Sequence, residues 1–238
     1  MSFAIIGGTG AQKIVEGSKA IVVNTEYGDV TLFENYHQGQ RYFLLLRHGL
    51  GHKTPPHLIN YRANTAALKK VGVKKVVAIY AVGSITDLIK PAEMTIIDQF
   101  IDFTGGSRAS TFEEGKGDKV YHSLMESPFD KKLSKELLNS AKKLNIELKE
   151  GGTYICTNGP RLETAAEIAM FKQWKADCVG MTAATETILA NEKRLKFTGI
   201  AYSINWAAGI NSKSISFVDD KTIDSLVCKI VKVALNVL

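Results

Sequence analysis

Side chains that can bind an anion follow several apolar runs of this sequence. Each lies within two residues of a glycine, where bare backbone N–H groups can approach a phosphate closely. Arginine offers a planar fork of donors that matches phosphate, and histidine and threonine add single donors. The residues are Thr9 within Gly7-Gly8-Thr9-Gly10, Arg47 and His48 before Gly49, and Thr182 after Gly180-Met181. Together they predict a pocket for an anion with several oxygens.

No acidic residue occurs in these turns, which favours free phosphate or a phosphate monoester over a metal-bridged polyphosphate. Each residue also has an ordinary structural role. Arg47 could form a surface ion pair, His48 could be a hydrogen-bonded core histidine, and the threonines could cap turns. Their common position at strand ends favours the binding site, because ligands of open α/β sheets lie beyond the carboxyl ends of the strands.

The opening turn also suggests a dinucleotide. That fingerprint requires a third glycine three residues after Gly10, and Lys13 stands there instead. A ribose-binding acid is missing at the expected distance, since Glu26 and Asp29 fall in a predicted hairpin. A dinucleotide-binding oxidoreductase is therefore an alternative that only the first glycines support.

The elements that must position these residues alternate in type. Apolar runs rich in β-branched residues predict strands at Ala4–Ile6, Ala20–Val23, Val30–Phe33, Tyr42–Leu46, Val76–Ala81, Met94–Phe100, Thr153–Cys156, Asp177–Met181 and Thr198–Ile204. Helical periodicity predicts helices at Leu58–Val71, Lys132–Leu144, Glu163–Trp174, Thr185–Arg194 and Asp219–Leu238, the last capped by Asp219 or Asp220. Short turns between early strands indicate antiparallel pairs, and later alternation with helices indicates parallel crossovers. We expect an α/β fold with a mixed central β-sheet surrounded by helices, in a single domain spanning residues 1–238.

Composition narrows the class of protein. The 238 residues carry 30 Lys+Arg against 24 Asp+Glu, a formal net charge of +6, but the lysines are scattered without aromatic interleaving and do not indicate nucleic-acid binding. No leader and no apolar run long enough for a membrane span is evident. Cys156, Cys178 and Cys228 lack metal-ligand spacing and lie among apolar neighbours, which predicts buried, reduced thiols in a cytoplasmic protein.

A series of short motifs runs nearly from end to end of the chain. They are Ile6-Gly7-Gly8-Thr9-Gly10, Arg47-His48-Gly49, His57–Asn64, Gly83-Ser84, Asp98–Asp102, Gly159-Pro160-Arg161, Gly180-Met181-Thr182 and Asn205–Gly209. In order and spacing, these motifs resemble those of the trimeric purine nucleoside phosphorylases and, within them, the methylthioadenosine phosphorylase branch. The resemblance implies phosphorolysis, in which inorganic phosphate converts a nucleoside into a sugar 1-phosphate and a free purine.

The resemblance also assigns residues. Phosphate would bind Thr9, Arg47, His48, backbone near Ala81, and Thr182, with His48 and Asn205 in catalysis. The nucleoside would lie against Met181, Asn205, Trp206, Ala207, Leu162, Phe217, Val218 and, from a neighbouring subunit, His122. It implies a homotrimer or a dimer of trimers. Phosphate is then a co-substrate, and neither a metal nor an organic cofactor is required.

Departures from the family pattern bear on the substrate. Asn205 and Ala207 stand where adenine-preferring members carry aspartates, and an amide can donate to a 6-oxo group and accept from a protonated purine N7. Phe217 and Val218 are apolar and lie in the segment that lines the 5′ pocket in the methylthio-specific branch. Together with Asn205 they make the chain most similar to the S-methyl-5′-thioinosine phosphorylase subgroup. The 5′-methylthio or 5′-hydroxyl sugar stays open, as do a methylthioadenosine phosphorylase and a non-catalytic nucleoside-binding protein. Tyr80 replaces a threonine that often helps to bind phosphate, Thr185 a proline, and Leu162 a phenylalanine that commonly stacks on the purine.

Overall fold

The computed structural model describes residues 2–106, 108–114, 119–120, 122–211 and 214–238. Its strands are β1 (Ser2–Gly7), β2 (Lys19–Thr25), β3 (Gly28–His37), β4 (Gln40–Leu46), β5 (Val73–Ser84), β6 (Met94–Ile97), β7 (Gln99–Asp102), β8 (Lys149–Glu150), β9 (Thr153–Cys156), β10 (Cys178–Gly180) and β11 (Lys196–Trp206). Its α-helices are α1 (Tyr61–Lys70), α2 (Lys131–Lys143), α3 (Ala165–Gln173), α4 (Ala183–Glu192) and α5 (Asp220–Leu235), with short 3-10 helices at Gln12–Val15, Leu50–His52 and Pro56–Leu58.

These strands form a mixed sheet in the order β2-β3-β4-β1-β5-β10-β9-β7, and β11 pairs with both β5 and β6. The early strands β2, β3 and β4 are antiparallel neighbours, as their short turns predict. Strand β1 lies parallel to β4 and β5, and β11 lies parallel to β5. The carboxyl ends of four parallel strands therefore meet at one edge, which confirms the predicted α/β class and brings the donor-bearing turns together.

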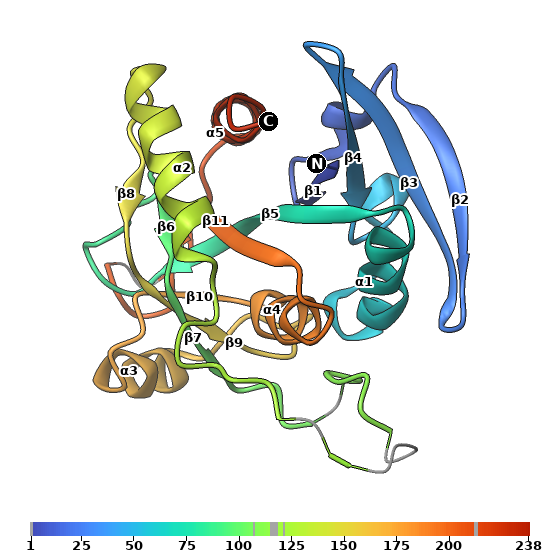
Figure 1. Cartoon of the computed structure of the whole chain (residues 1–238). Coiled ribbons are helices and arrows are strands. Elements are labelled where there is room, and N and C mark those ends of the chain that lie inside the picture. The colour runs from blue at the N-terminus through green and yellow to red at the C-terminus, as the bar shows by residue number, and fades with distance from the viewer. Residues whose placement is uncertain (1, 107, 115–118, 121, 212–213) are drawn as a thin grey trace.

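Helices cover both faces of β5 and β11, with α2 and α5 on one face and α1 and α4 on the other (Figure 1). The pleat of β5 explains why both faces are apolar. Val76, Ala78 and Tyr80 pack in the core cluster with α1 and α4, whereas Val77 and Ile79 pack with α2 and α5. A strand that is buried on both faces has a continuous run of apolar residues in its sequence, and β5 has such a run.

The predicted strand Met94–Phe100 is two strands. The chain turns at Asp98, whose Oδ1 accepts a hydrogen bond from Gly152 N (3.1 Å). Strand β6 then pairs with β11 and β8, while β7 pairs with β9. A polar residue inside the apolar run marks the break.

Helix ends follow ordinary capping chemistry. Asp219 is the N-cap of α5, because its side chain accepts from Thr222 N (2.9 Å). Helix α1 starts later than predicted, at Tyr61, where Asn60 caps it by accepting from Ala63 N (3.0 Å).

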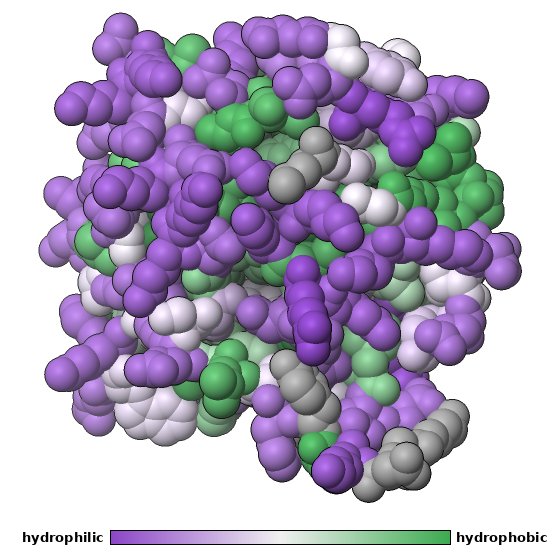
Figure 2. All heavy atoms as spheres, in the orientation of Figure 1, coloured by the Kyte–Doolittle hydropathy of each residue, from purple (hydrophilic) through white to green (hydrophobic). Residues whose placement is uncertain are grey.

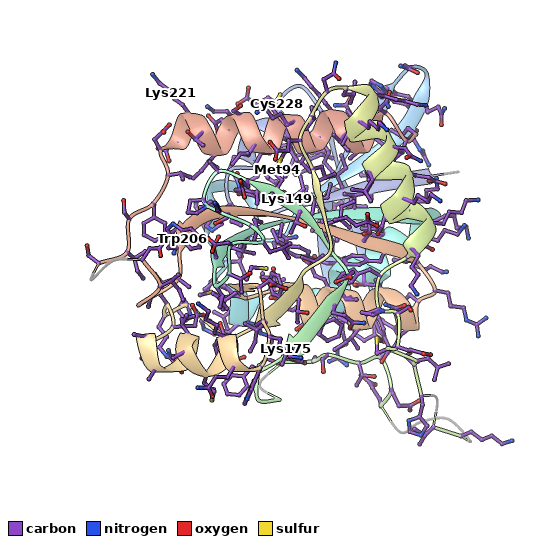
Figure 3. The ribbon with its side chains drawn as sticks, turned by 90° about the vertical axis from the view of Figure 1, so that its left-hand side faces the viewer. Met94, Lys149, Lys175, Trp206, Lys221 and Cys228 are labelled. Carbon is purple, nitrogen blue, oxygen red and sulfur yellow. The ribbon has the colours of Figure 1, made fainter. Side chains whose placement is uncertain are left out.

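The expectation of buried thiols is wrong for one of the three free cysteines. Cys156 and Cys178 are buried, but Cys228 is exposed on α5 (Figure 3). Its neighbour Val227 faces the core, and one residue along a helix rotates the side chain by about 100°. Polar side chains dominate the face drawn in Figure 2. No helix among the described residues is long and apolar enough to cross a membrane.

Candidate active site

A cavity of about 580 Å³ lies at the carboxyl ends of the parallel strands. Ten of the residues selected from the sequence line it, namely Thr9, Arg47, His48, Ala81, Leu162, Met181, Thr182, Asn205, Ala207 and Phe217. They come from β1, β4, β5, β9, β10 and β11 and the loops that follow these strands, so one concave site collects residues from most of the chain. Its size suits a small ligand rather than a polymer.

Arg47 forms a buried two-point ion pair with Glu186. Its Nε donates to Oε1 (2.7 Å) and its Nη2 to Oε2 (3.1 Å), and both side chains are nearly inaccessible to solvent. Burial alone lowers the pKa of Arg47, but the charge and hydrogen bonds of Glu186 outweigh this and raise it. The guanidinium therefore stays charged inside the protein.

The glycine-rich turn makes room for that guanidinium. A Cβ on Gly8 would lie 2.2 Å from Arg47 Nη1, so a side chain at this position would displace the arginine. The same Nη1 donates to the Ile79 carbonyl (2.8 Å), which fixes the plane of the group. Gly8 thus serves the arginine of this site, which is not the role that a dinucleotide fingerprint would give it.

His48 is neutral at physiological pH. Burial, followed by the charge of Arg47, lowers its pKa from 6.5 to about 4. Its Nδ1 lies 2.8 Å from the Thr54 carbonyl, which can only accept, so Nδ1 carries the hydrogen and Nε2 a lone pair. The sequence suggested a donor here, but the free nitrogen of the neutral ring is an acceptor. The His52 ring lies 4.2 Å away, centroid to centroid, and its pKa is also lowered by burial.

Thr182 is the N-cap residue of α4, yet its side chain makes no capping hydrogen bond. The structural alternative of a capping threonine therefore fails, and the hydroxyl lies in the cavity wall. The first N–H groups of a helix carry a partial positive charge that favours an anion. Arg47, Thr9 and this helix start thus surround one end of the cavity with donors.

The other end of the cavity is largely apolar and carries two polar side chains. Asn205 is buried and donates through Nδ2 to the Trp206 carbonyl (2.8 Å), which leaves its other N–H and its Oδ1. Glu163 accepts from Thr157 Oγ1 at Oε1 (2.6 Å) and has its pKa raised by burial. Sequence reasoning missed Glu163, although its place directly after Leu162, before the capped start of α3, was a usable signal.

Three residues selected from the sequence do not line the cavity of this chain. Trp206 lies at the end of β11 (Figure 3), and its indole N–H is 3.2 Å from the Asn211 side chain in the amide orientation that satisfies both groups. Val218 donates its backbone N–H to the Ile204 carbonyl (2.8 Å). His122 is exposed on the segment between β7 and α2.

Arg108 is a second buried arginine that the sequence did not single out. Its guanidinium donates to the carbonyls of Met181, Asn158 (2.7 Å) and Thr157 (3.2 Å). It therefore joins the segment after β7 to two walls of the cavity. Among the described residues, no group of three or more His, Cys, Asp or Glu side chains is arranged to hold a metal ion.

Known proteins share this fold over its whole length. A sequence profile of the phosphorylase superfamily matches residues 2–237. The probable S-methyl-5′-thioinosine phosphorylase of Methanocaldococcus jannaschii is 39% identical over 98% of this chain and 91% of its own. The probable 6-oxopurine nucleoside phosphorylase of Dictyoglomus turgidum is 42% identical over 91% of this chain and 82% of its own. A crystal structure of a Schistosoma mansoni adenosine/methylthioadenosine phosphorylase double mutant with adenine superposes with a TM-score of 0.90 at 27% identity, covering 100% of this chain and 90% of that one.

Proposed function

Because this chain belongs to the phosphorylase superfamily, we infer that it is a purine nucleoside phosphorylase, a pentosyltransferase. Inorganic phosphate attacks C1′ of the sugar, the glycosidic bond breaks, and the products are a sugar 1-phosphate and a free purine that has gained a proton. The transition state carries positive charge on the sugar and negative charge on the leaving base. An enzyme accelerates this step by placing an anion below C1′ and a hydrogen-bonding group at the purine.

Phosphate binds at the donor-rich end in this proposal. Thr9, Arg47, Thr182 and the backbone at Ala81 hold its oxygens, because these groups line that end of the cavity and Arg47 is fixed there by its ion pair with Glu186. His48 accepts the hydrogen of monohydrogen phosphate at Nε2, since its other nitrogen is already bonded to Thr54. The nucleophile comes from this phosphate, so the reaction needs no cofactor.

We propose that the purine carries a 6-oxo group, and Glu163 is the observation that carries this assignment. A 6-oxopurine has a hydrogen on N1, whereas adenine has a lone pair there. Glu163 Oε1 accepts from Thr157, and the carboxylate lines the cavity, where it can also accept from N1–H of a 6-oxopurine. The Asn205 amide can then donate to O6 and accept from the protonated N7. Adenine would leave Glu163 and Asn205 without these hydrogen bonds, and a site with unpaired buried groups discriminates strongly against such a ligand.

The sugar end favours a 5′-methylthio group. Ile215 and Phe217 line the cavity beyond Asn205, and Phe217 is held there by an isolated β-bridge to Asn205. A thioether gains by contact with such apolar side chains, whereas a 5′-hydroxyl needs a polar partner. We propose 5′-methylthioinosine as the preferred substrate, ahead of inosine and guanosine.

We propose that the active form is a homotrimer in which His122 closes the pocket of a neighbouring subunit. The residue is exposed and absent from the cavity of its own chain. Val120 and Leu124 on either side of it are 64% and 86% exposed, which is costly for apolar side chains unless another subunit covers them. We also propose a cytoplasmic location, because the three cysteines are free and thiols stay reduced in the cytoplasm.

The deciding experiment is a nucleoside panel with and without inorganic phosphate. We expect phosphate-dependent release of hypoxanthine from 5′-methylthioinosine, slower release from inosine, and little adenine from 5′-methylthioadenosine. Rapid adenine release with no hypoxanthine would replace the 6-oxopurine assignment by a methylthioadenosine phosphorylase. Release that does not depend on phosphate would indicate a hydrolase. Size-exclusion chromatography with light scattering tests the trimer on the same sample.

A further inference from the structure

Three tyrosines with fully buried side chains contact residues at the donor-rich end of the cavity. Tyr80, Tyr154 and Tyr202 are at most 1% exposed and are the three largest fully buried side chains of the described residues. Buried hydroxyl groups require partners, and each of these hydroxyls meets a different element of the proposed phosphate site. The three contacts come from three different strands, β5, β9 and β11.

Tyr80 acts on Arg47 in two ways. Its hydroxyl donates to Glu186 Oε2 (2.8 Å), the oxygen that also accepts from Arg47 Nη2. Its ring lies under the guanidinium, with Arg47 Cζ 4.9 Å from the ring centroid. The hydroxyl is thus committed to the carboxylate, and the ring limits where the arginine can lie.

Tyr154 holds the start of α4. Its hydroxyl accepts from Thr182 N (3.2 Å), the backbone of a residue in the cavity wall. A Cβ on Gly180 would lie 2.1 Å from this hydroxyl, so glycine is required where the tyrosine reaches across β10. The ring also packs against Tyr80, with centroids 5.6 Å apart.

Tyr202 holds the glycine-rich turn. Its hydroxyl donates to the carbonyl of Thr9 (2.6 Å), 193 residues away in the sequence. A carbonyl oxygen repels a phosphate oxygen, and a carbonyl bonded to a hydroxyl cannot turn toward the anion. This contact therefore sets the orientation of the turn that carries the Thr9 side chain.

We propose that Tyr80, Tyr154 and Tyr202 are positioning residues, which fix Arg47, Thr182 and Thr9 in the arrangement that binds phosphate before phosphate arrives. The proposal rests on the function proposed above. Burial raises the pKa of all three hydroxyls, so they stay protonated. A phenol on two torsions loses little freedom on ordering, which makes it a rigid support for a group that must be preorganised.

The test replaces each tyrosine by phenylalanine, which removes one hydroxyl and keeps the ring. We expect Tyr80→Phe, Tyr154→Phe and Tyr202→Phe each to raise the KM for phosphate about tenfold, because each leaves a phosphate-binding element without its support. The KM for the nucleoside should change less than about twofold, since none of the three hydroxyls touches the purine end. A purely structural role would lower the melting temperature and leave both KM values in place.

Tyr42→Phe is the matched control, because Tyr42 is a buried tyrosine of β4 whose side chain packs in the core cluster of α2 and α5. Its KM for phosphate should equal that of the wild type. The Tyr80→Phe/Tyr202→Phe double variant should show the product of the two single effects, since the contacts lie on separate walls. Unchanged phosphate KM in all three single variants, or a rise equal to that of Tyr42→Phe, overturns the proposal.

Calorimetry with inorganic phosphate alone separates this proposal from the proposed function. If the wild type binds phosphate but cleaves no nucleoside, the function fails, and weaker phosphate binding by the three variants still supports the positioning role. If the wild type cleaves nucleosides and the variants bind phosphate as it does, the function stands and the positioning role fails.

Discussion

Arg47 and Glu186 lie 139 residues apart in the sequence and form an ion pair with two hydrogen bonds in the interior of the protein. Their charges cancel, and neighbouring His48 is neutral. The donor-rich end of the cavity therefore lacks an uncompensated buried cation among these groups. Arg47 would then hold phosphate through directed hydrogen bonds rather than through an unpaired charge, so small displacements of its guanidinium would weaken binding.

We expect Glu186→Gln to destabilise the fold and to weaken phosphate binding. Removing one partner of a buried pair leaves the other charge uncompensated, which costs about 3–5 kcal/mol of unfolding free energy. Urea denaturation measures this loss, and the KM for phosphate should rise in parallel. Glu136→Gln is the control, because it breaks a pair with Lys75 whose side chains are 31% and 22% exposed and should cost less than about 1 kcal/mol. Equal losses in the two variants would contradict the argument.

The side chain at position 205 should determine which purine base the enzyme prefers. A protonated aspartic acid at this position would present an acceptor to the 6-amino group of adenine and a donor to N7, whereas the amide serves a 6-oxopurine. We expect Asn205→Asp to move the ratio of kcat/KM for inosine over adenosine at least about tenfold toward adenosine. Asn139→Asp, an exposed change on α2, should leave the ratio unchanged. A ratio that stays constant in Asn205→Asp would remove Asn205 from base recognition.

Local sequence predicts the elements of this fold well where neighbouring residues decide the structure. The two-residue turn Glu26-Tyr27 joins the antiparallel strands β2 and β3, as the short connection predicts. Asp98 marks a possible break within the apolar run from Met94 to Phe100. The different partners of the two resulting strands depend instead on distant segments, such as that of Gly152, 54 residues from Asp98. The apolar neighbours of Cys228 suggested burial, but its position on α5 places the side chain on the exposed face of the helix.

The part of the site that could be predicted from the sequence consists of residues that directly follow the strands. Thr9, Arg47, His48 and Thr182 meet in one cavity because parallel strands place their following residues at one edge. The partners of these residues were not predictable. Glu186 reaches Arg47 from α4, and Tyr80 reaches Glu186 from inside β5, contacts that only the packing of helix on sheet creates. Glu163 differs from these, because its place directly before the capped start of α3 can be recognised in the sequence.

Stability should fall in mild acid because of His48. Its pKa is about 4 in the folded chain and 6.5 when exposed, so between these values the unfolded chain binds a proton that the folded chain does not. The unfolding free energy therefore decreases as the pH falls through this range. We expect His48→Asn to reduce the loss between pH 7 and pH 5 by about 1–2 kcal/mol, measured by urea denaturation. The exposed His57→Asn variant should follow the wild type, and identical pH slopes in all three proteins would exclude the effect.

Thr185 offers a stabilising substitution in the first turn of α4. Within the described part of the chain its hydroxyl is buried and has no hydrogen-bond partner, which carries a desolvation penalty. We expect Thr185→Val to raise the unfolding free energy by about 1 kcal/mol, since it removes the unpaired oxygen and keeps the shape. Thr187, equally buried on the same helix, donates to the Ala183 carbonyl (2.7 Å), so Thr187→Val should destabilise the protein instead. Thermal unfolding of the two variants gives changes of opposite sign if the hydroxyl of Thr185 is unsatisfied, and a lower melting temperature for Thr185→Val would show that it has a partner.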